Sequence, residues 1–429
     1  MSREPDHTPE SGAPVNSDVS AVSEATPPTV RLQISAAKKL NLADFQNAVP
    51  VLHELVIVNG TSTPISELSV HLVSEPPFVK PRAWNVELVA AGESYHLSDL
   101  DVQLDGALFS RLTEAELASL HLDLRSRQQG NEVIAHLDCA VELLPRNQWG
   151  GIDYLPEMLA AFVQPNDPAI DRLLKGAALA LQAGGKSGSI DGYTHGLKRA
   201  WELASGIWAA VLQRKLNYAL PPANFEHIGQ KIRSPTQVID GGLATCLDLA
   251  LLFAACLEQA HLNPLLVCTR GHAFVGVWLR DEEFSTSVVD DITAVRNRLK
   301  LQEMLVFEST LAAQGQAVGF SRAIAHANRQ LSEEEQEKKE NKFQLVIDVK
   351  RARRSRIKPL AQAQAVADAM PVEVEPETAI GVEDAPDLPD EAITDTSLSE
   401  LDPNDRLARW QRKLLDLSLR NTLLNFKQG

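Results

Sequence analysis

The stretch Gly241-Gly242-Leu243-Ala244-Thr245-Cys246-Leu247-Asp248-Leu249-Ala250 joins a glycine turn to the start of an apolar helical segment. A second stretch, Gly271-His272-Ala273-Phe274-Val275-Gly276-Val277-Trp278, is typical of a buried strand. Free N–H groups at a helix N-terminus favour the thiolate form of a cysteine placed there. A histidine on a neighbouring strand can accept the thiol proton. The two stretches therefore predict a nucleophile, Cys246, with His272 as its base.

Two acids, Asp290 and Asp291, follow on the next expected strand. A carboxylate there can orient the histidine and stabilise its charged form. The backbone N–H of Cys246 would point toward a developing oxyanion. The alternative interpretation is structural: Cys246 as a small buried residue at a helix start, and His272 as a strand histidine whose hydrogen bonds are satisfied.

Around these motifs, helical and strand patterns predict an α+β domain over residues 146–350. The expected helices are 170–183, 197–212 and 245–260, and the expected strands are 265–269, 272–279, 285–289 and 343–349. Cys256 and Cys268 lie in apolar runs and are expected to be packing residues.

Residues 30–145 have a different pattern. Short alternating runs are separated by turn signals such as Asn59-Gly60 and Pro76-Pro77. The expected strands are 51–58, 68–73, 84–88, 120–124 and 133–143. This spacing predicts a β-sandwich that resembles an immunoglobulin-like fold in pattern, with a structural or docking role.

The charge is unevenly distributed. The 429-residue chain has a net charge of −16, and residues 362–405 alone hold thirteen acids and no base. We therefore expect a disordered tail over residues 1–29 and a flexible linker, basic and then acidic, over 351–405. The basic run at 350–358 could touch nucleic acid, but such runs are more often solvated, so nucleic-acid binding through this chain is not favoured.

Several classes of protein are not indicated. No apolar stretch is long enough for a membrane span, and the N-terminus lacks a signal-peptide pattern. Four cysteines without such a signal suggest reduced thiols and a cytoplasmic location. There is no C-x-x-C or H-E-x-x-H motif, so no metal site is predicted, and no cofactor.

The segment around Cys246, His272 and the following acids resembles the core of the transglutaminase-like superfamily of papain-type thiol enzymes. The resemblance covers about residues 190–295. It implies Cys246 as nucleophile, His272 as base, and Asp291 or Asp290 as the acid, with Asp291 slightly favoured. Papain-type sites often use a glutamine in the oxyanion hole, and Gln230 could take that role or be a surface loop residue. The family's usual aromatic residue before its Asp is absent, since Ser285-Thr286-Ser287-Val288-Val289 occupies that stretch.

Residues 409–426 resemble the opening of a domain found in very large bacterial proteins that continue into a helicase and a restriction-endonuclease-like domain and resemble components of anti-phage defence. An apolar helical face formed by Leu407, Trp410, Leu414 and Leu417 has no following partner. We therefore expect residues 406–429 to begin a further, truncated domain, and the downstream helicase and nuclease domains to be partners of this chain.

Two functions remain open. In the first, a Cys-His-Asp triad performs amide-bond chemistry on a protein or peptide, as a peptidase, an amidase or an acyltransferase. In the second, an inactive transglutaminase-like fold serves as a sensor or interaction module for the downstream domains.

Overall fold

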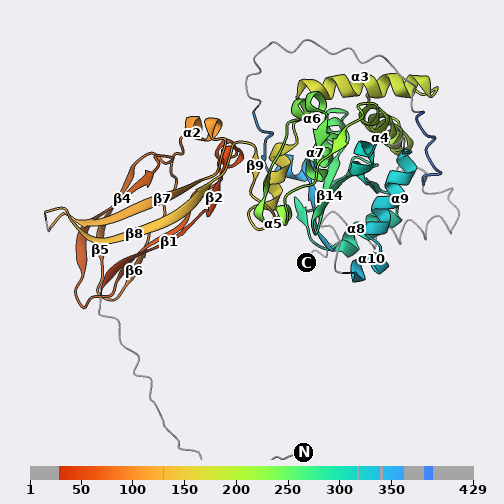
Figure 1. Cartoon of the computed structure of the whole chain (residues 1–429). Coiled ribbons are helices and arrows are strands. Elements are labelled where there is room, and N and C mark those ends of the chain that lie inside the picture. Colours follow the sequence, from red (N-terminus) through yellow and green to blue (C-terminus); the bar gives the residue numbers. More distant parts are fainter. Residues whose placement is uncertain (1–28, 129, 316–317, 339–341, 362–380, 390–429) are drawn as a thin grey trace, which may run out of the picture.

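The computed structural model describes residues 29–128, 130–315, 318–338, 342–361 and 381–389. It is a mixed α/β protein in which a strand-rich part is followed by a part with helices packed on a sheet (Figure 1). The expected tail (save Thr29), most of the acidic linker and the expected helix at 406–429 lie outside the described residues. Within the described residues, no helix has both the length and the apolar character needed to cross a membrane.

The strand-rich part contains two sheets. One is antiparallel, in the order β1 (Val30–Ala36), β3 (Leu52–Asn59) and β6 (Ser94–His96). The other has the order β2 (Lys39–Leu40), β8 (Glu132–Leu143), β7 (Glu116–Ser126), β4 (Ile65–Glu75) and β5 (Arg82–Val89). The five expected strands are confirmed, each within a longer or slightly shifted element. Short helices α1 (Leu42–Gln46) and α2 (Gly106–Arg111) lie at one end (Figure 1).

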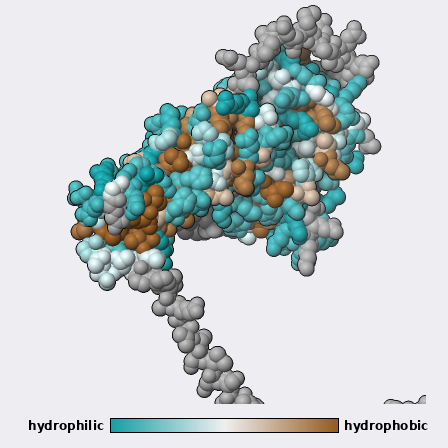
Figure 2. Space-filling model, turned by 60° about the vertical axis from the view of Figure 1, so that its left-hand side comes forward, coloured by the Kyte–Doolittle hydropathy of each residue, from teal (hydrophilic) through white to brown (hydrophobic). Residues whose placement is uncertain are grey.

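Strand β7 shows why the two sheets face each other. Ala118, Leu120, Leu122 and Leu124 are buried and alternate with more exposed polar residues. Because side chains alternate across a strand, the leucines enter the core and the polar residues form the outer face. Exposed hydrophobic side chains interrupt the hydrophilic surface of the molecule (Figure 2).

The second part is built around an antiparallel five-stranded sheet. Its order is β15 (Val288–Val289), β17 (Phe343–Asp348), β13 (Pro264–Thr269), β14 (His272–Trp278) and β16 (Met304–Phe307). The expected strands at 265–269, 272–279 and 343–349 are confirmed. The strand expected at 285–289 is reduced to two residues, and β16 was not predicted.

Helix α7 (Cys246–Gln259) occupies the centre of this part. It packs against β13 and β14 on one side and against α3 (Pro168–Ala183) and α4 (Gly196–Leu212) on the other (Figure 1). These three helices coincide with the expected ones. Nearly every residue of α7 is buried, which explains why its sequence is apolar all round rather than on one stripe.

Smaller elements complete this part. They are β9 (Gln148–Trp149), η1 (Pro156–Phe162), β10 (Asn217–Tyr218), α5 (Phe225–Ile228), β11 (Gln230–Lys231), α6 (Pro235–Gly241), β12 (Leu243–Ala244), α8 (Ile292–Lys300), η2 (Ser309–Ala313), α9 (Phe320–Gln330), α10 (Glu333–Glu337) and α11 (Val349–Arg354). An aromatic cluster of Trp208, Phe253, Phe307 and Phe320 ties α4, α7, β16 and α9 together, with ring centroids 5.1 to 6.0 Å apart.

The basic run at 350–358 is not a free linker. Most of it lies in or directly after α11, where Arg353 makes a two-pronged ion pair with Glu258 at 2.8 and 2.9 Å. Arg354 pairs with the buried carboxylate of Glu283 at 2.7 Å, and the N–H of Leu360 donates to Ala161. The folded part thus extends past the boundary expected at Lys350, and its paired charges are less available to phosphate groups.

The described piece of the acidic linker, residues 381–389, also lies on the folded body. Lys186 Nζ is 2.8 Å from an Asp384 carboxylate oxygen, and the N–H of Ser321 donates to Glu383 at 3.0 Å. Val382 and Leu388 pack against the hydrophobic core. This nonapeptide therefore combines ion pairing with apolar contact, unlike the extended linker expected from its charge.

Gly229 connects α5 to β11 and so positions Gln230. Its φ of +86° is a conformation that residues with a side chain rarely adopt, and an added Cβ would lie 1.9 Å from the Trp149 carbonyl oxygen. We expect Gly229→Ala to lower the free energy of unfolding by about 3 kcal/mol or more, measured by urea denaturation.

Gly241→Ala is the matched control for Gly229→Ala, because a Cβ there meets nothing within 4 Å and Gly241 is the last residue of α6. Its stability should stay close to that of the wild type. Equal losses in the two variants would contradict the packing described around Gly229.

Candidate active site

Cys246 is the first residue of α7, and the sequence explains the helix start at that point. Thr245 is the N-cap: its side chain accepts the Asp248 N–H at 3.2 Å, and Asp248 accepts the Thr245 N–H at 2.9 Å. This reciprocal pair satisfies two backbone donors that a helix start leaves free. Gly242, with a φ of +64°, ends α6 and lets the chain turn into β12 and α7.

Asp248 also holds the neighbouring loop. One of its carboxylate oxygens accepts the Arg233 N–H at 2.8 Å, and the other pairs with the Arg233 guanidinium at 2.8 Å. Asp248 is 1% exposed, so this ion pair is screened little by solvent. The segment that carries Gln230 is thereby fixed to the start of α7.

His272 begins β14, the strand that packs against α7, and its side chain lies near enough to the Cys246 thiol for the two groups to interact electrostatically. Its Nε2 lies 2.8 Å from Oε2 of Glu308, which leaves Nδ1 as the ring nitrogen for the thiol. The sequence prediction of a Cys246–His272 pair therefore corresponds to two groups that the structure brings together.

The carboxylate beside His272 is Glu308, not Asp290 or Asp291. Glu308 follows β16, which is the direct neighbour of β14 in the sheet. Asp290 and Asp291 follow β15, at the opposite edge of the sheet, with β17 and β13 between it and β14. Both aspartates are exposed, and Asp291 serves as the N-cap of α8 by accepting the Thr293 N–H at 2.8 Å.

Glu308 is held in a fixed orientation. Its Oε1 accepts from the N–H and hydroxyl of Thr310 at 3.0 and 2.8 Å. Its Oε2 accepts from Gln330 Nε2 at 2.5 Å as well as facing His272. Thr310 and Gln330 thus set the carboxylate, which in turn sets the plane of the imidazole.

The pKa values of the pair favour the charged forms. Burial would lower the pKa of His272, but hydrogen bonds with Cys246 and Glu308 outweigh it and raise the pKa from 6.5 to about 10. Burial would raise the pKa of Glu308, but the hydrogen bond and charge of His272 lower it from 4.5 to about 2. The arrangement therefore supports an imidazolium beside the sulfur atom.

Gln230 is buried and contacts the residue before Cys246. Its Nε2 donates to Thr245 Oγ1 at 3.0 Å, while its Oε1 has no hydrogen-bond partner. An amide turned by 180° would accept the Thr245 hydroxyl proton through Oε1 and leave Nε2 free to donate to an oxyanion. The surface-loop alternative for Gln230 does not apply, because its side chain is 3% exposed.

Tyr218 is a site residue that the sequence analysis did not identify. It lies on β10, which pairs with β12, the strand that ends two residues before Cys246, and its side chain is a neighbour of the thiol. Burial and the neighbouring Cys246 raise the pKa of Tyr218 above its usual range. Cys246 itself is 0% exposed, so the thiol is covered by its neighbours.

An open pocket of about 430 Å³ lies beside the imidazole. It is lined by His272, Glu308, Thr310, His326, Arg329, Gln330 and Glu335. Gln330 is 8% exposed, and its Oε1 lacks a hydrogen-bond partner. The pocket therefore brings charged and polar side chains together beside His272.

The other two buried cysteines lack these partners. Burial raises the pKa of Cys256 above the usual range, and burial with the nearby Cys246 raises the pKa of Cys268 to about 12. Both are 0–1% exposed. They match the packing role expected for them and serve as internal controls for Cys246.

No protein-family model, curated protein or solved structure matches this chain. The chemistry of the site is therefore read from its own residues. A thiol at a helix start, an imidazole that can carry its proton and a fixed carboxylate can together perform nucleophilic attack on a carbonyl carbon.

The Glu308–His272 pair predicts a defined pH dependence. Because the pKa of Glu308 is lowered, its contribution to stability is fully present above pH 4.5 and is lost as the pH falls toward 2. Because the pKa of His272 is raised, its contribution is fully present below pH 6.5 and is lost as the pH rises toward 10. Wild type should therefore exceed Glu308→Gln in stability most strongly between pH 4.5 and 6.5.

Urea unfolding of the two proteins at several pH values tests this window, and NMR titration of His272 tests its cause. Glu308→Gln should lower the pKa of His272, because the variant removes the carboxylate that stabilises the imidazolium. An unchanged His272 titration in Glu308→Gln would show that the pair does not form in solution.

Proposed function

We propose that residues 146–361 form a transglutaminase-like, papain-type domain that performs cysteine-dependent amide-bond chemistry, and that residues 30–145 form an immunoglobulin-like sandwich. The observation that carries the proposal is the grouping of Cys246, His272 and Glu308, in which His272 lies 2.8 Å from Glu308 and has the Cys246 thiol as a neighbour. The first acts as nucleophile, the second as base and acid, and the third as the orienting carboxylate.

The proposed reaction has two steps. The Cys246 thiolate attacks an amide carbonyl, and the C–N bond breaks as His272 gives its proton to the leaving amine. A thioester between Cys246 and the acyl group results. Water or a second amine then attacks the thioester, gives its proton to His272, and releases the acid or a new amide.

The oxyanion of each step needs hydrogen-bond donors that are in place beforehand. The backbone N–H of Cys246 lies at the free start of α7, where the helix leaves donors unpaired. Gln230 can supply a second donor from its anchored position against Thr245. This pair of donors is the arrangement that stabilises a tetrahedral intermediate in acyl transfer.

Protein or peptide substrates fit the surroundings of the thiol. Exposed apolar side chains lie on β12 and shortly after β10: Leu243, on β12, is 38% exposed, and Leu220, two residues after β10, is 85% exposed. The pocket beside His272 adds Arg329 and the free acceptor of Gln330. Exposed apolar side chains near the thiol, together with a polar pocket beside His272, suit a polypeptide substrate better than a small charged metabolite.

The resemblance of residues 409–426 supports a wider setting for this chemistry. We place the domain in the N-terminal part of a bacterial nucleic-acid-processing protein of the anti-phage defence type, with downstream helicase and nuclease domains as its partners. Those residues lie outside the described part of the structure, so the setting rests on their sequence alone.

A second function is favoured by one observation, the complete burial of Cys246. A thiol that stays covered would make the domain a sensor or interaction module instead of an enzyme. The two functions differ in whether Cys246 becomes accessible and reactive in solution.

Site-resolved iodoacetamide labelling separates the two functions. Cys246 should react on the order of tenfold faster than Cys256 and Cys268 near pH 6, because only Cys246 has an imidazolium beside it. His272→Ala should remove the difference. Tyr218→Phe should speed labelling of Cys246, because the variant removes a hydroxyl that neighbours the thiol. Equal, slow labelling of all three cysteines would favour the interaction module.

The identity of the acid is tested with two charge-removing variants. In a screen of peptide and protein amides, read by hydrolysis and by thioester trapping with hydroxylamine, Cys246→Ala should abolish turnover and Glu308→Gln should reduce kcat by about 10²-fold or more. Asp291→Asn should retain the wild-type rate, since asparagine is an equally good N-cap for α8. A loss in Asp291→Asn with normal activity in Glu308→Gln would reverse the assignment.

A further inference from the structure

The outer face of the strand-rich part carries the same tripeptide twice. His121-Leu122-Asp123 lies on β7, and His136-Leu137-Asp138 lies on the neighbouring strand β8. Leu122 is buried, so the histidine and aspartate on either side of it lie on the outer face. Because the set is divided between two strands, no metal-ligand spacing within one segment predicts it.

The antiparallel register brings the two copies together. His121 is directly opposite Asp138, and Asp123 is directly opposite His136. Each histidine therefore faces an aspartate from the other strand. Side chains that lie opposite each other on one sheet face are close enough to bind a common ligand.

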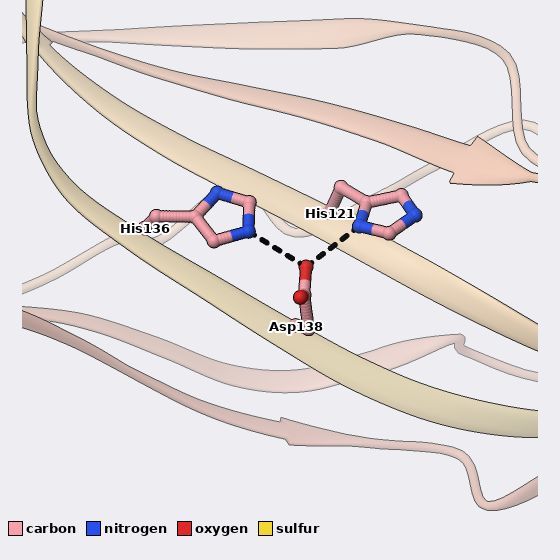
Figure 3. A group of neighbouring side chains, drawn as sticks. All are labelled: His121, His136 and Asp138. Carbon is pink, nitrogen blue, oxygen red and sulfur yellow. Dashed lines mark hydrogen bonds and ion pairs between the residues drawn. The ribbon is translucent and has the colours of Figure 1, made fainter.

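Both imidazoles point at a single oxygen atom. Oδ1 of Asp138 is 2.6 Å from Nδ1 of His121 and 2.8 Å from Nε2 of His136 (Figure 3). The two rings are stacked, with centroids 6.3 Å apart and an angle of 17° between their planes. The three ligand atoms lie within 4.8 Å of one another, close to the separation that a common ion requires.

Asp123 and Arg125 support this group from one side. Oδ1 of Asp123 accepts the Nδ1–H of His136 at 2.7 Å, which directs the Nε2 of that ring toward Asp138. The other oxygen of Asp123 pairs with the Arg125 guanidinium at 2.8 Å. A carboxylate that orients a ligating histidine through its second nitrogen is a recurring feature of protein metal sites.

We propose that His121 Nδ1, His136 Nε2 and Asp138 form a binding site for a divalent transition-metal ion such as Zn²⁺, with Asp123 as the residue that positions His136. A Zn²⁺ ion would take the place of the ring protons that otherwise face Asp138, and small side-chain rotations would give ligand distances of about 2.0–2.2 Å. Two imidazole nitrogens favour Zn²⁺ and similar ions over Ca²⁺ or Mg²⁺, which prefer oxygen ligands.

The site has three protein ligands and lies at the surface, with His136 and Asp138 about half exposed. Its remaining coordination position is therefore open to water or to a side chain of another molecule. It is separate from Cys246 and His272, which lie in the other part of the molecule, so this inference does not depend on the proposed function.

The test is calorimetric titration of the full chain, free of any histidine tag, with ZnCl₂. A Cys246→Ala background removes the candidate catalytic thiol as a competing ligand. We expect one equivalent of Zn²⁺ to bind with micromolar affinity, and Co²⁺ to give a visible absorption band in the same protein. His136→Ala and Asp138→Asn should each weaken binding at least about tenfold, and Asp123→Asn by about 10- to 100-fold.

His96→Ala is the matched control, because His96 is an exposed histidine of the other sheet with its own carboxylate partner, Glu54, at 3.4 Å. It should leave Zn²⁺ binding unchanged. Circular dichroism checks that each variant is folded, and NMR should show Zn²⁺-dependent shifts of His121 and His136 only. No binding at millimolar Zn²⁺, or binding that persists in folded Asp138→Asn and His136→Ala, would overturn the proposal.

Discussion

The buried carboxylate of Asp248 holds together the segments that make the candidate active site. It closes the capping box with Thr245, pairs with Arg233, and so fixes both the start of α7 and the strand that carries Gln230. A charge that is 1% exposed is costly unless every lone pair is engaged, and here three hydrogen-bonding contacts engage it. The position of Cys246 depends on this carboxylate although Asp248 does not contact a substrate in the proposed reaction.

The Cys246–His272 pair could be predicted because each half is a local pattern. A glycine turn followed by an apolar helix places Cys246, and an apolar run typical of a buried strand places His272. The acid could not be predicted in the same way, because its identity depends on strand order. Chain order suggested Asp290 and Asp291, but β15 joins the far edge of the sheet and the four-residue strand β16 joins β14. The apolar run before Glu308 was the available signal, and four residues are too few for periodicity to distinguish a strand from a helix.

In the strand-rich part, too, the individual strands could be predicted from the sequence, but their arrangement relative to one another could not. Alternation between apolar and polar residues predicted most of its strands, since each strand buries one face. Register is a property of two strands together, and no single stretch contains it. The pairing of His121 with Asp138 therefore emerges only from the structure, even though the repeated His-Leu-Asp tripeptide is visible in the sequence. In the same way, the acidity of residues 381–389 suggested an extended chain, whereas Lys186 and the apolar contacts of Val382 and Leu388 hold this piece on the folded body.

That attachment makes residues 381–389 a ligand supplied by the chain itself. Because the segment is covalently connected to its own binding surface, its effective local concentration is on the order of millimolar even if each contact is weak. A separate acidic peptide would have to exceed that concentration to reach Lys186 and the start of α9. The surface around Lys186 and the start of α9 therefore binds the chain's own segment in preference to outside partners. A molecule that bound residues 381–389 would expose this surface.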